Sequence, residues 1–292
     1  MKKSRPTISA YVITIGEPTL ADCLRHLKKQ TLPLDFIDVV ANMPGYANAR
    51  NEVHRRVDTD YFLPVDADML LHPRCVEILF SKIVHRPEIF DVVGRLHDPL
   101  LGSIMGIHLL RTDAVKHVAY EDSIVGDAIF MDGMSQQYHK VVLERVVGLH
   151  RPDYCQLVQL YHKFTREGEK IRTKENAGRF RMDFKNLLQA YRRGNHSAAI
   201  ALIFLCHGLF TNGESSYNYL EYDNARAQTA AQLVAEVLKL SPSSEDTWKE
   251  RMFHRHYYYL YLWRDLINKV QRRLSAYPKT PKCHPTGIVD AI

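Results

Sequence analysis

The sequence predicts an α/β protein with a Rossmann-like, mostly parallel sheet flanked by helices, followed by a helical C-terminal domain. Two observations support this fold class. Short β-branched and apolar runs alternate with amphipathic stretches over the first eighty or so residues, which is typical of a doubly wound sheet. After residue 154 the strand pattern stops and long helical patterns follow, so we expect domains at residues 1–154 and 155–292.

The first half of the predicted sheet follows the chain in order. The run TISAYVITI has the character of a buried parallel strand, and the next stretch, LADCLRHLKKQ, places its leucines on one helical face. The turn signal NMPG ends the second strand, and Pro73 suits the first turn of a helix. The predicted strands are 7–15, 36–41 and 60–68, and the predicted helices are 20–30, 47–57 and 73–84.

The rest of the chain continues this pattern and then becomes helical. We expect strands at 90–96, 103–110 and 146–149, with a helix at 112–118. The predicted helices of the second domain are 183–193, 196–210, 219–240 and 245–275. Aromatic and basic residues alternate in MFHRHYYYLYLWRDLINKVQRR near the C-terminus, and burial of one broad helical face explains that pattern.

Composition indicates an ordinary soluble, globular protein. The chain has 292 residues, of which 46% are hydrophobic and 25% charged. Five cysteines are spread without a CxxC pair, which argues against a disulfide framework or a structural zinc site and favours the cytoplasm. The longest later apolar run, AAIALIFLCHGLF, is too short to span a bilayer, so we expect no transmembrane segment.

Positive charge is concentrated in one segment. The net charge is +6, and residues 163–193 alone hold ten Lys or Arg against four Asp or Glu. The basic stretch HKFTREGEKIRTKENAGRFR could clamp a pyrophosphate, because Lys and Arg bind phosphate well, or it could be a solvated loop. An anionic partner is therefore an expectation and not a conclusion.

The strongest chemical motif is the Asp-Ala-Asp at the end of the third apolar run, YFLPVDADMLLHP. In an extended chain, alternation puts Asp66 and Asp68 on the same side, where both can face one cation. Ligands of such sheets bind beyond the carboxyl ends of the strands, and these aspartates lie at such an end. Hard divalent ions take oxygen ligands, so the motif predicts a Mn²⁺ or Mg²⁺ site.

Two segments resemble the GT-A nucleotide-sugar glycosyltransferases, especially the large family-2 group. AYVITIGEPTLADCLRHLKKQT is similar to the opening strand and helix of that group. GYANARNEVHRRVDTDYFLPVDADMLLHP is similar to its next block, in which a glycine and an Ala-Arg-Asn lead into a strand, an Asp-x-Asp and a proline. The resemblance covers residues 8–75 well and 90–152 loosely, and the helical second half carries none of it.

This resemblance implies roles for named residues. Asp66 would lie near the ribose and the metal, and Asp68 would bind the metal that holds the diphosphate. Further residues would border the nucleoside or the nucleotide-sugar: Thr14, Gly16, Glu17, Arg50 and Asn51. The family usually has an aspartate after the second strand to bind the base, whereas this chain has Asn42 and Met43 there, so the nucleoside is open, with uridine diphosphate the first choice.

The resemblance also implies a catalytic base and a further metal ligand. Inverting members place a carboxylate in the region of AYEDSIVGDAIFMDGM, where Asp127 has the better spacing to the following aromatic and basic residues. Asp122 is the second candidate base and Asp132 the third. His150, directly after a short apolar strand, is expected to be a metal ligand or to contact the diphosphate, since imidazole is a common ligand.

The sequence therefore predicts a metal-dependent glycosyltransferase that moves a sugar from a nucleotide-sugar donor to a saccharide acceptor, with inversion as the simplest outcome. Three alternatives stay open. The acceptor may be a hydroxylated base in DNA, as in phage-type DNA modification, which steep salt dependence would reveal. The chain may instead be a non-catalytic nucleotide- or nucleic-acid-binding module, or a nucleotidyltransferase. The oligomeric state is not predicted.

Overall fold

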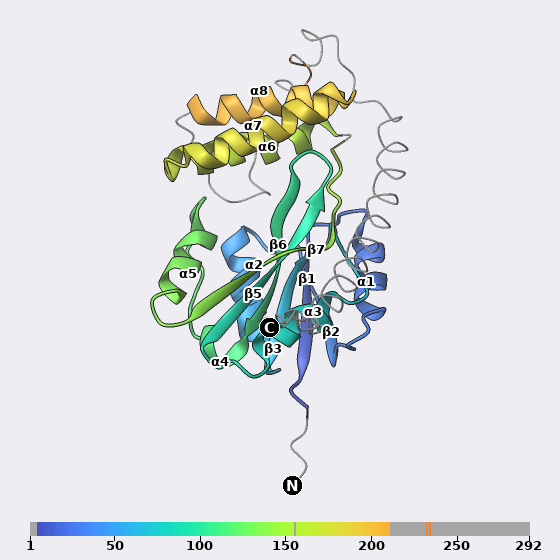
Figure 1. Cartoon of the computed structure of the whole chain (residues 1–292), viewed down its shortest axis with the longest axis vertical. Helices are drawn as coiled ribbons and strands as arrows, with labels where there is room; N and C mark the ends of the chain where they lie inside the picture. Colours follow the sequence, from blue (N-terminus) through green and yellow to red (C-terminus); the bar gives the residue numbers. More distant parts are fainter. Residues whose placement is uncertain (1–4, 155, 211–231, 233, 235–292) are drawn as a thin grey trace, which may run out of the picture. The chain divides into compact units, whose positions relative to one another are not determined.

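The computed structural model describes residues 5–154 and 156–210, together with residues 232 and 234 (Figure 1). This part lies within one compact unit, Met1–Asp246. Most of the predicted helix 219–240, all of the predicted helix 245–275 and the aromatic segment 252–273 fall outside it.

A seven-stranded sheet forms the centre of the described structure, in the order β2-β1-β3-β6-β5-β7-β4. Apolar, β-branched runs form its buried strands. The strands are β1 (Ile8–Thr14), β2 (Phe36–Ala41), β3 (Tyr61–Asp66), β4 (Met69–Leu71), β5 (Ile89–Asp98), β6 (Gly102–Arg111) and β7 (His139–His150).

Five of these strands run in one direction. The pairs β1–β2, β1–β3 and β5–β7 are parallel, whereas β6 is antiparallel to both β3 and β5, and β4 is antiparallel to β7. The α/β fold class is thus confirmed, with a mixed sheet in which β4 and β6 run against the other five. The carboxyl ends of β1, β2, β3, β5 and β7 consequently point toward the same edge of the sheet.

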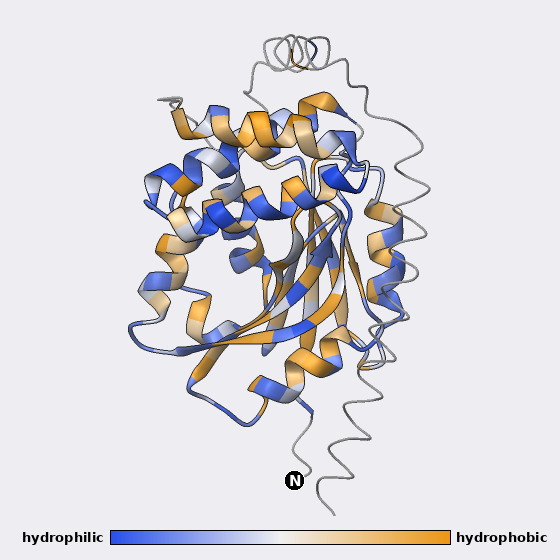
Figure 2. Cartoon of the chain, turned by 45° about the horizontal axis from the view of Figure 1, so that its top comes forward, coloured by the Kyte–Doolittle hydropathy of each residue, from blue (hydrophilic) through white to orange (hydrophobic). Residues whose placement is uncertain are grey.

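Helices cover both faces of the sheet because neighbouring strand residues point to opposite sides. Ile8, Ala10 and Val12 of β1 pack in a core with α1 and α3, while Tyr11 packs on the other face with α2, α4 and α5. Figure 2 shows the hydrophobic residues concentrated on the strands between these layers. The helices are α1 (Leu20–Lys28), α2 (Tyr46–Arg56), α3 (Cys75–Ile83), α4 (Thr112–Val115) and α5 (Gly126–Met134).

Three further helices follow the sheet: α6 (Leu157–Thr173), α7 (Ala177–Arg192) and α8 (His196–Phe210). They share a second hydrophobic core, to which the turn between β5 and β6 contributes Leu100 and Leu101, and the segment after β7 contributes Tyr154. The basic stretch at residues 162–181 lies within α6, the linker after it and the start of α7, so the expectation of a solvated loop is wrong.

Strand β4 and the length of β7 were not predicted. The predicted strand 60–68 is interrupted, because Ala67 and Asp68 form a turn between β3 and β4. β4 pairs with the end of β7, and this register sets Met69 opposite His150. Gly148 permits the close approach of the two strands, since a Cβ atom there would lie 2.8 Å from the carbonyl oxygen of Leu70.

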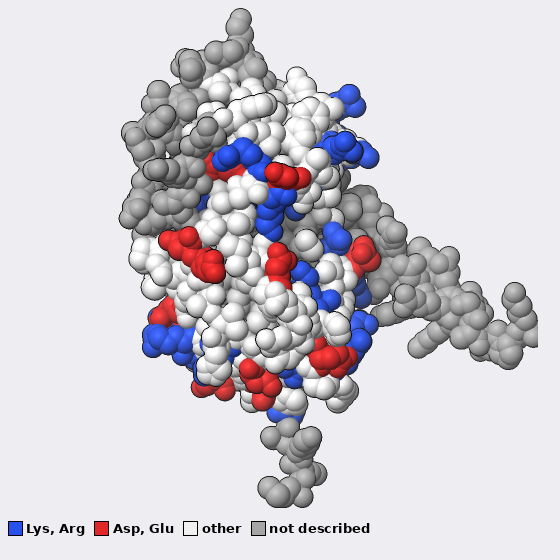
Figure 3. Space-filling model, turned by 90° about the vertical axis from the view of Figure 1, so that its left-hand side faces the viewer, with Lys and Arg blue, Asp and Glu red and all other residues white. Residues whose placement is uncertain are grey.

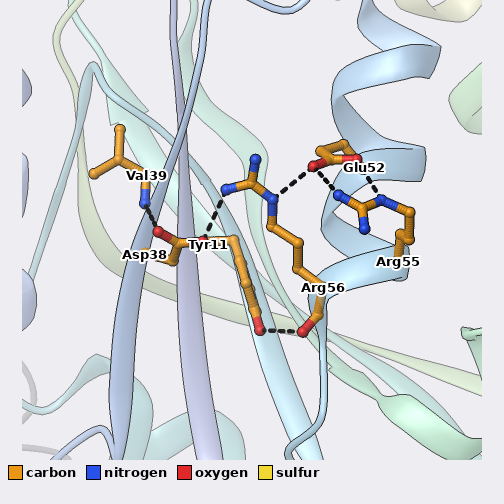
Figure 4. A network of polar contacts seen from close by, with 6 residues as sticks. All are labelled: Tyr11, Asp38, Val39, Glu52, Arg55 and Arg56. Atoms are coloured by element: carbon orange, nitrogen blue, oxygen red, sulfur yellow. Dashed lines mark hydrogen bonds and ion pairs between the residues drawn. The ribbon is translucent and has the colours of Figure 1, made fainter.

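A surface ion-pair network connects α2 to β2, the outermost strand on the side of the sheet opposite β4 (Figure 4). Arg56 contacts Asp38 at 3.0 Å and Glu52 at 2.7 Å, and the hydroxyl of Tyr11 donates to the carbonyl of Arg56 at 3.2 Å. The network borders a cavity of about 420 Å³ that Phe36 also lines. Because Arg56 shares its charge between two carboxylates, we assign this network to the stability of the fold.

Among the residues with a described structure, no helix has both the length and the apolar character needed to cross a membrane.

The buried His54 gives the stability of the protein a predictable pH dependence. Its Nδ1–H donates to the carbonyl of Val118 at 3.0 Å, and its ring packs against Phe62, Tyr120 and Phe130. Burial lowers the pKa of His54 to about 4, whereas the same group titrates near 6.5 in the unfolded chain. The unfolded state therefore binds the proton first, and stability is lost as the pH falls from 6.5 to 4.

We expect His54 to account for roughly 2–3 kcal/mol of the stability lost between pH 7 and pH 4.5. Urea unfolding at both pH values measures this loss in the wild type and in His54→Asn, whose amide can replace the donor to Val118. The variant should lose less stability over this interval than the wild type. The exposed His85 provides the control, because His85→Asn should follow the wild type; equal losses in all three proteins would contradict the prediction.

Candidate functional site

The candidate site lies where the codirectional strands end. Thr14 is the last residue of β1, Asp66 of β3, Asp98 of β5 and His150 of β7. Four of the five strand ends at this edge thus carry a polar side chain able to bind a ligand or a metal. Asn42, directly after β2, adopts a positive φ of 53° and donates its backbone N–H to the carbonyl of Thr14.

His150 lies between two carboxylates. Its Nε2 is 3.2 Å from Oδ2 of Asp68, and its Nδ1 is 2.7 Å from Oδ2 of Asp98. Burial favours the neutral ring, but the two carboxylates outweigh that effect and raise the pKa of His150 to about 9. The same charge pairing lowers the pKa of Asp68, although burial acts in the opposite direction. The imidazole of His150 thus lies between the carboxylates of Asp68 and Asp98.

Asp68 also has an unused oxygen. Its Oδ1 atom is buried and has no hydrogen-bond partner among the described residues, while the side chain as a whole is 19% exposed. A buried carboxylate oxygen without a partner is costly, and this one is available to a cation. The chain turns at Asp68, and its backbone carbonyl accepts the N–H of Arg151 at 2.8 Å, which fixes the turn beside the end of β7.

Asp66 is paired with a different cation. Nη2 of Arg50, from α2, contacts Oδ1 of Asp66 at 3.1 Å, and the Arg50 guanidinium lies 4.9 Å from the centre of the Tyr46 ring. Burial raises the pKa of the Asp66 carboxyl, and the attraction of Arg50 does not fully offset it. The resemblance implies that Arg50 and Asp66 both lie near the nucleotide-sugar, and the structure brings their side chains into contact. The two aspartates do not lie on one extended strand, because Ala67 and Asp68 form a turn. Binding of one metal by Asp66, Asp68 and His150 stays a prediction.

The turn after β1 holds three of the predicted residues. Glu17 accepts hydrogen bonds from the hydroxyl of Thr14 at 2.5 Å and from the backbone N–H of Ile15 at 2.9 Å. Gly16 adopts a positive φ of 97°, and its N–H donates to the hydroxyl of Thr14. Glu17 therefore shapes this turn. Contact of these residues with a nucleoside stays a prediction.

The region after β6 contains the candidate bases. Asp127 is in the first turn of α5, and its buried Oδ1 atom has no hydrogen-bond partner within the part of the chain that the structure describes. Its charge influences both Arg50 and Asp66, which places it in the same part of the molecule as the strand ends. Asp122 lies in the exposed loop before α5, and Asp132 is exposed near the end of that helix.

Asn51 holds the loop that leads to α5. Its amide nitrogen donates to the carbonyl of Tyr120 at 3.0 Å, and its amide oxygen accepts the N–H of Tyr120 at 2.7 Å. This pair of bonds fixes the approach to Asp127. The Tyr120 ring in turn stacks on Phe130 of α5, with 4.1 Å between centroids.

Asp68 and His150 fit a divalent cation whose coordination is completed by a bound substrate. Within the described ranges, no three His, Cys, Asp or Glu side chains already form a metal cage. Mg²⁺ and similar ions are commonly held by one or two protein ligands and complete their coordination with substrate phosphates and water. Asp68 would supply one protein ligand through its Oδ1 atom, and the adjacent imidazole of His150 would supply a second. The remaining coordination positions would then be left to substrate and water.

Sequence reasoning missed Asp98 and Lys163. Asp98 is fully buried, and Lys163 on α6 is close enough for its charge to influence Asp68, Asp98 and His150. The only signal for Asp98 was its place after an apolar strand in VVGRLHDP, which it shares with Asp66. Lys163 gave no local signal, because it is one of many basic residues in its segment.

No protein-family model and no curated protein matches the chain. Solved structures do. The mannosyltransferase PcManGT from Pyrobaculum calidifontis, in complex with GDP-Man and Mn²⁺, is similar with a TM-score of 0.44 and 14% identity. The match covers 79% of this chain and 81% of that one.

Two other structures are similar at the same level. Glucosyl-3-phosphoglycerate synthase from Mycobacterium tuberculosis, with Mn²⁺ and UDP-glucose, matches with a TM-score of 0.40 and 16% identity, over 50% of this chain and 72% of that one. S. aureus TarS matches with a TM-score of 0.42 and 13% identity, over 77% and 78%. TM-scores below 0.5 assign no activity to this chain.

Proposed function

We propose that the chain is a metal-dependent glycosyltransferase that moves a sugar from a nucleotide-sugar, with a uridine diphosphate sugar as the first candidate, to an acceptor hydroxyl. One observation carries the proposal. Asp68 presents a buried, unused carboxylate oxygen beside His150, at the edge of the sheet where β1, β3, β5 and β7 end.

The arrangement of charges supports binding of a diphosphate. A divalent metal held by Asp68 and His150 would act as a Lewis acid that neutralises charge on the leaving diphosphate. Arg50 is 7% exposed, and the neighbouring Tyr46 and Asp66 raise its pKa against the effect of burial, so that its guanidinium stays charged. We assign Arg50 and Asp66 to the donor, and Thr14, Gly16 and Glu17 to the turn that borders its nucleoside.

Asp127 is the proposed base. It accepts the proton of the acceptor hydroxyl while the hydroxyl oxygen forms a bond to the anomeric carbon. The bond between that carbon and the phosphate oxygen breaks, and the nucleoside diphosphate leaves with its electron pair. A single displacement of this kind inverts the anomeric configuration. Its buried oxygen without a partner supports Asp127 over the exposed Asp122.

A saccharide is the proposed acceptor. Binding along a DNA backbone would call for a continuous basic surface. On the face in Figure 3, the Lys and Arg of the described residues are interspersed with Asp and Glu. The aromatic segment 252–273 lies outside the described residues, so it lends the DNA alternative no structural support.

A donor-hydrolysis screen tests the proposal. We expect release of a nucleoside diphosphate from at least one of a panel of UDP- and GDP-sugars in the presence of Mn²⁺. Excess EDTA should remove the activity, and added Mn²⁺ or Mg²⁺ should restore it, because the leaving group then regains its counter-charge. Release at the same rate in EDTA, or no release from any donor, would contradict the proposal.

A further inference from the structure

Asp98 is a buried carboxylate with an unusually complete set of hydrogen bonds. Its Oδ1 accepts the backbone N–H groups of Leu100 at 2.8 Å and Leu101 at 2.7 Å. Its Oδ2 accepts the hydroxyl of Tyr154 and Nδ1–H of His150, each at 2.7 Å. The side chain is fully buried, and both of its oxygens accept hydrogen bonds from groups other than His150.

These bonds fix the direction of the His150 ring. An ionised carboxylate only accepts hydrogen bonds, so the Nδ1 atom of His150 must carry a proton. In the neutral ring the other nitrogen, Nε2, is then free of hydrogen and able to bind a metal. Nε2 is the atom that faces Asp68, the proposed metal ligand, at 3.2 Å.

We infer that Asp98 is a positioning residue that selects the metal-binding tautomer of His150, and this inference rests on the proposed function. Histidines that bind metals usually donate their second N–H to a carboxylate or carbonyl, which sets the ring orientation and raises ligand basicity. Asp98 itself is held rigidly, because Leu100, Leu101 and Tyr154 belong to the core of helices α6–α8. The packing of these helices thus supports the orientation of a metal ligand at the end of the sheet.

The substitution Asp98→Asn distinguishes selection of the His150 tautomer from a purely structural role of Asp98 in the core. The asparagine oxygen can still accept the N–H groups of Leu100 and Leu101, and the volume of the side chain is kept. Its NH₂ group then replaces Oδ2 opposite His150 and can only donate. Nδ1 of His150 must become the acceptor, so its proton moves to Nε2, where it blocks metal binding.

The test is Mn²⁺ binding to the full-length protein, measured from free Mn²⁺ by electron paramagnetic resonance. We expect Asp98→Asn to weaken Mn²⁺ affinity by about 10–100-fold, the usual effect of losing a partner of a metal-bound histidine. Asp91→Asn is the matched control. Asp91 is also fully buried in β5, and its Oδ2 also contacts a histidine, His108 Nδ1 at 2.9 Å, but it does not contact His150. This control should bind Mn²⁺ as the wild type does.

The tautomer is measured separately, by ¹⁵N NMR of the Mg²⁺-loaded wild type. We expect a proton on Nδ1 of His150 and none on Nε2, and this result does not depend on whether Asp98→Asn folds. Wild-type Mn²⁺ affinity in Asp98→Asn, the opposite tautomer in the wild type, or equal weakening by Asp91→Asn would overturn the inference alone. Absence of Mn²⁺ binding by the wild type would overturn the proposed function and, with it, this inference.

Discussion

Replacing Asp68 with alanine is expected to lower sugar transfer by roughly 10³-fold and to abolish measurable Mn²⁺ binding. A catalytic metal contributes several kcal/mol of charge stabilisation to the transition state. A loss of about 4 kcal/mol corresponds to a 10³-fold lower rate. The substitution removes the buried oxygen that has no partner, and it also removes one of the two carboxylates that contact His150. Transfer rates with saturating Mn²⁺ and calorimetric titration with Mn²⁺ measure the two effects.

Two further variants make this result specific. Asp68→Asn keeps the volume of the side chain but has no charge, and we expect nearly the same loss, since an amide is a poor ligand for the ion. Asp38→Ala removes a carboxylate that is also paired with a cation, Arg56, but lies in the network of Figure 4, away from the strand ends. It should keep wild-type activity. Unchanged transfer in Asp68→Ala would remove the central assignment of the metal site.

Local pattern was sufficient to predict two elements whose residues are uniformly apolar or nearly so. The run FIDVVA is β2 over the predicted range, and HSAAIALIFLCHGLF is α8 over the predicted range. Both are bounded by turn residues and are uniform in character. The sequence HKVVLERVVGLH, in contrast, alternates charged and apolar residues and was predicted as a strand only at its end, although all of it forms β7.

The parts of the site that the sequence did not predict depend on contacts between distant segments. Asp98 and His150 are 52 positions apart, and Asp98 and Tyr154 are 56 apart. Their proximity follows from the parallel pairing of β5 with β7, which no short motif encodes. The turn at Ala67 and Asp68 is a similar case, because β4 forms only by pairing with the end of β7.

The neighbourhood of Arg50 and Asp66, by comparison, followed from the resemblance, because the two residues lie in two motifs of the same block, ANARN and PVDAD. Their partners were not predicted. The sequence assigned both aspartates to one cation and gave no indication that Asp66 contacts Arg50 and Asp68 contacts His150.

Replacing Asp127 with asparagine is expected to lower kcat by about 10²–10⁴-fold, the usual contribution of a general base. Binding of the nucleotide-sugar should change less than kcat, since the residue acts on the acceptor hydroxyl and influences the donor residues Arg50 and Asp66 only through its charge. Steady-state transfer rates measure the first effect, and titration with the donor in the presence of Mn²⁺ measures the second.

Variants of Asp122, the second candidate base, show whether the loss in Asp127→Asn is specific. Asp122→Asn changes the exposed carboxylate in the loop before α5, and Glu121→Gln changes its exposed neighbour as a matched control. If Asp127 is the base, both variants keep most of the activity, because only the carboxylate within hydrogen-bond reach of the acceptor hydroxyl takes its proton. A large loss in Asp122→Asn with an active Asp127→Asn would move the base from the first turn of α5 to the loop. The metal assignment at Asp68 would stand in either case, because it depends on contacts at the ends of β3 and β7 that neither substitution alters.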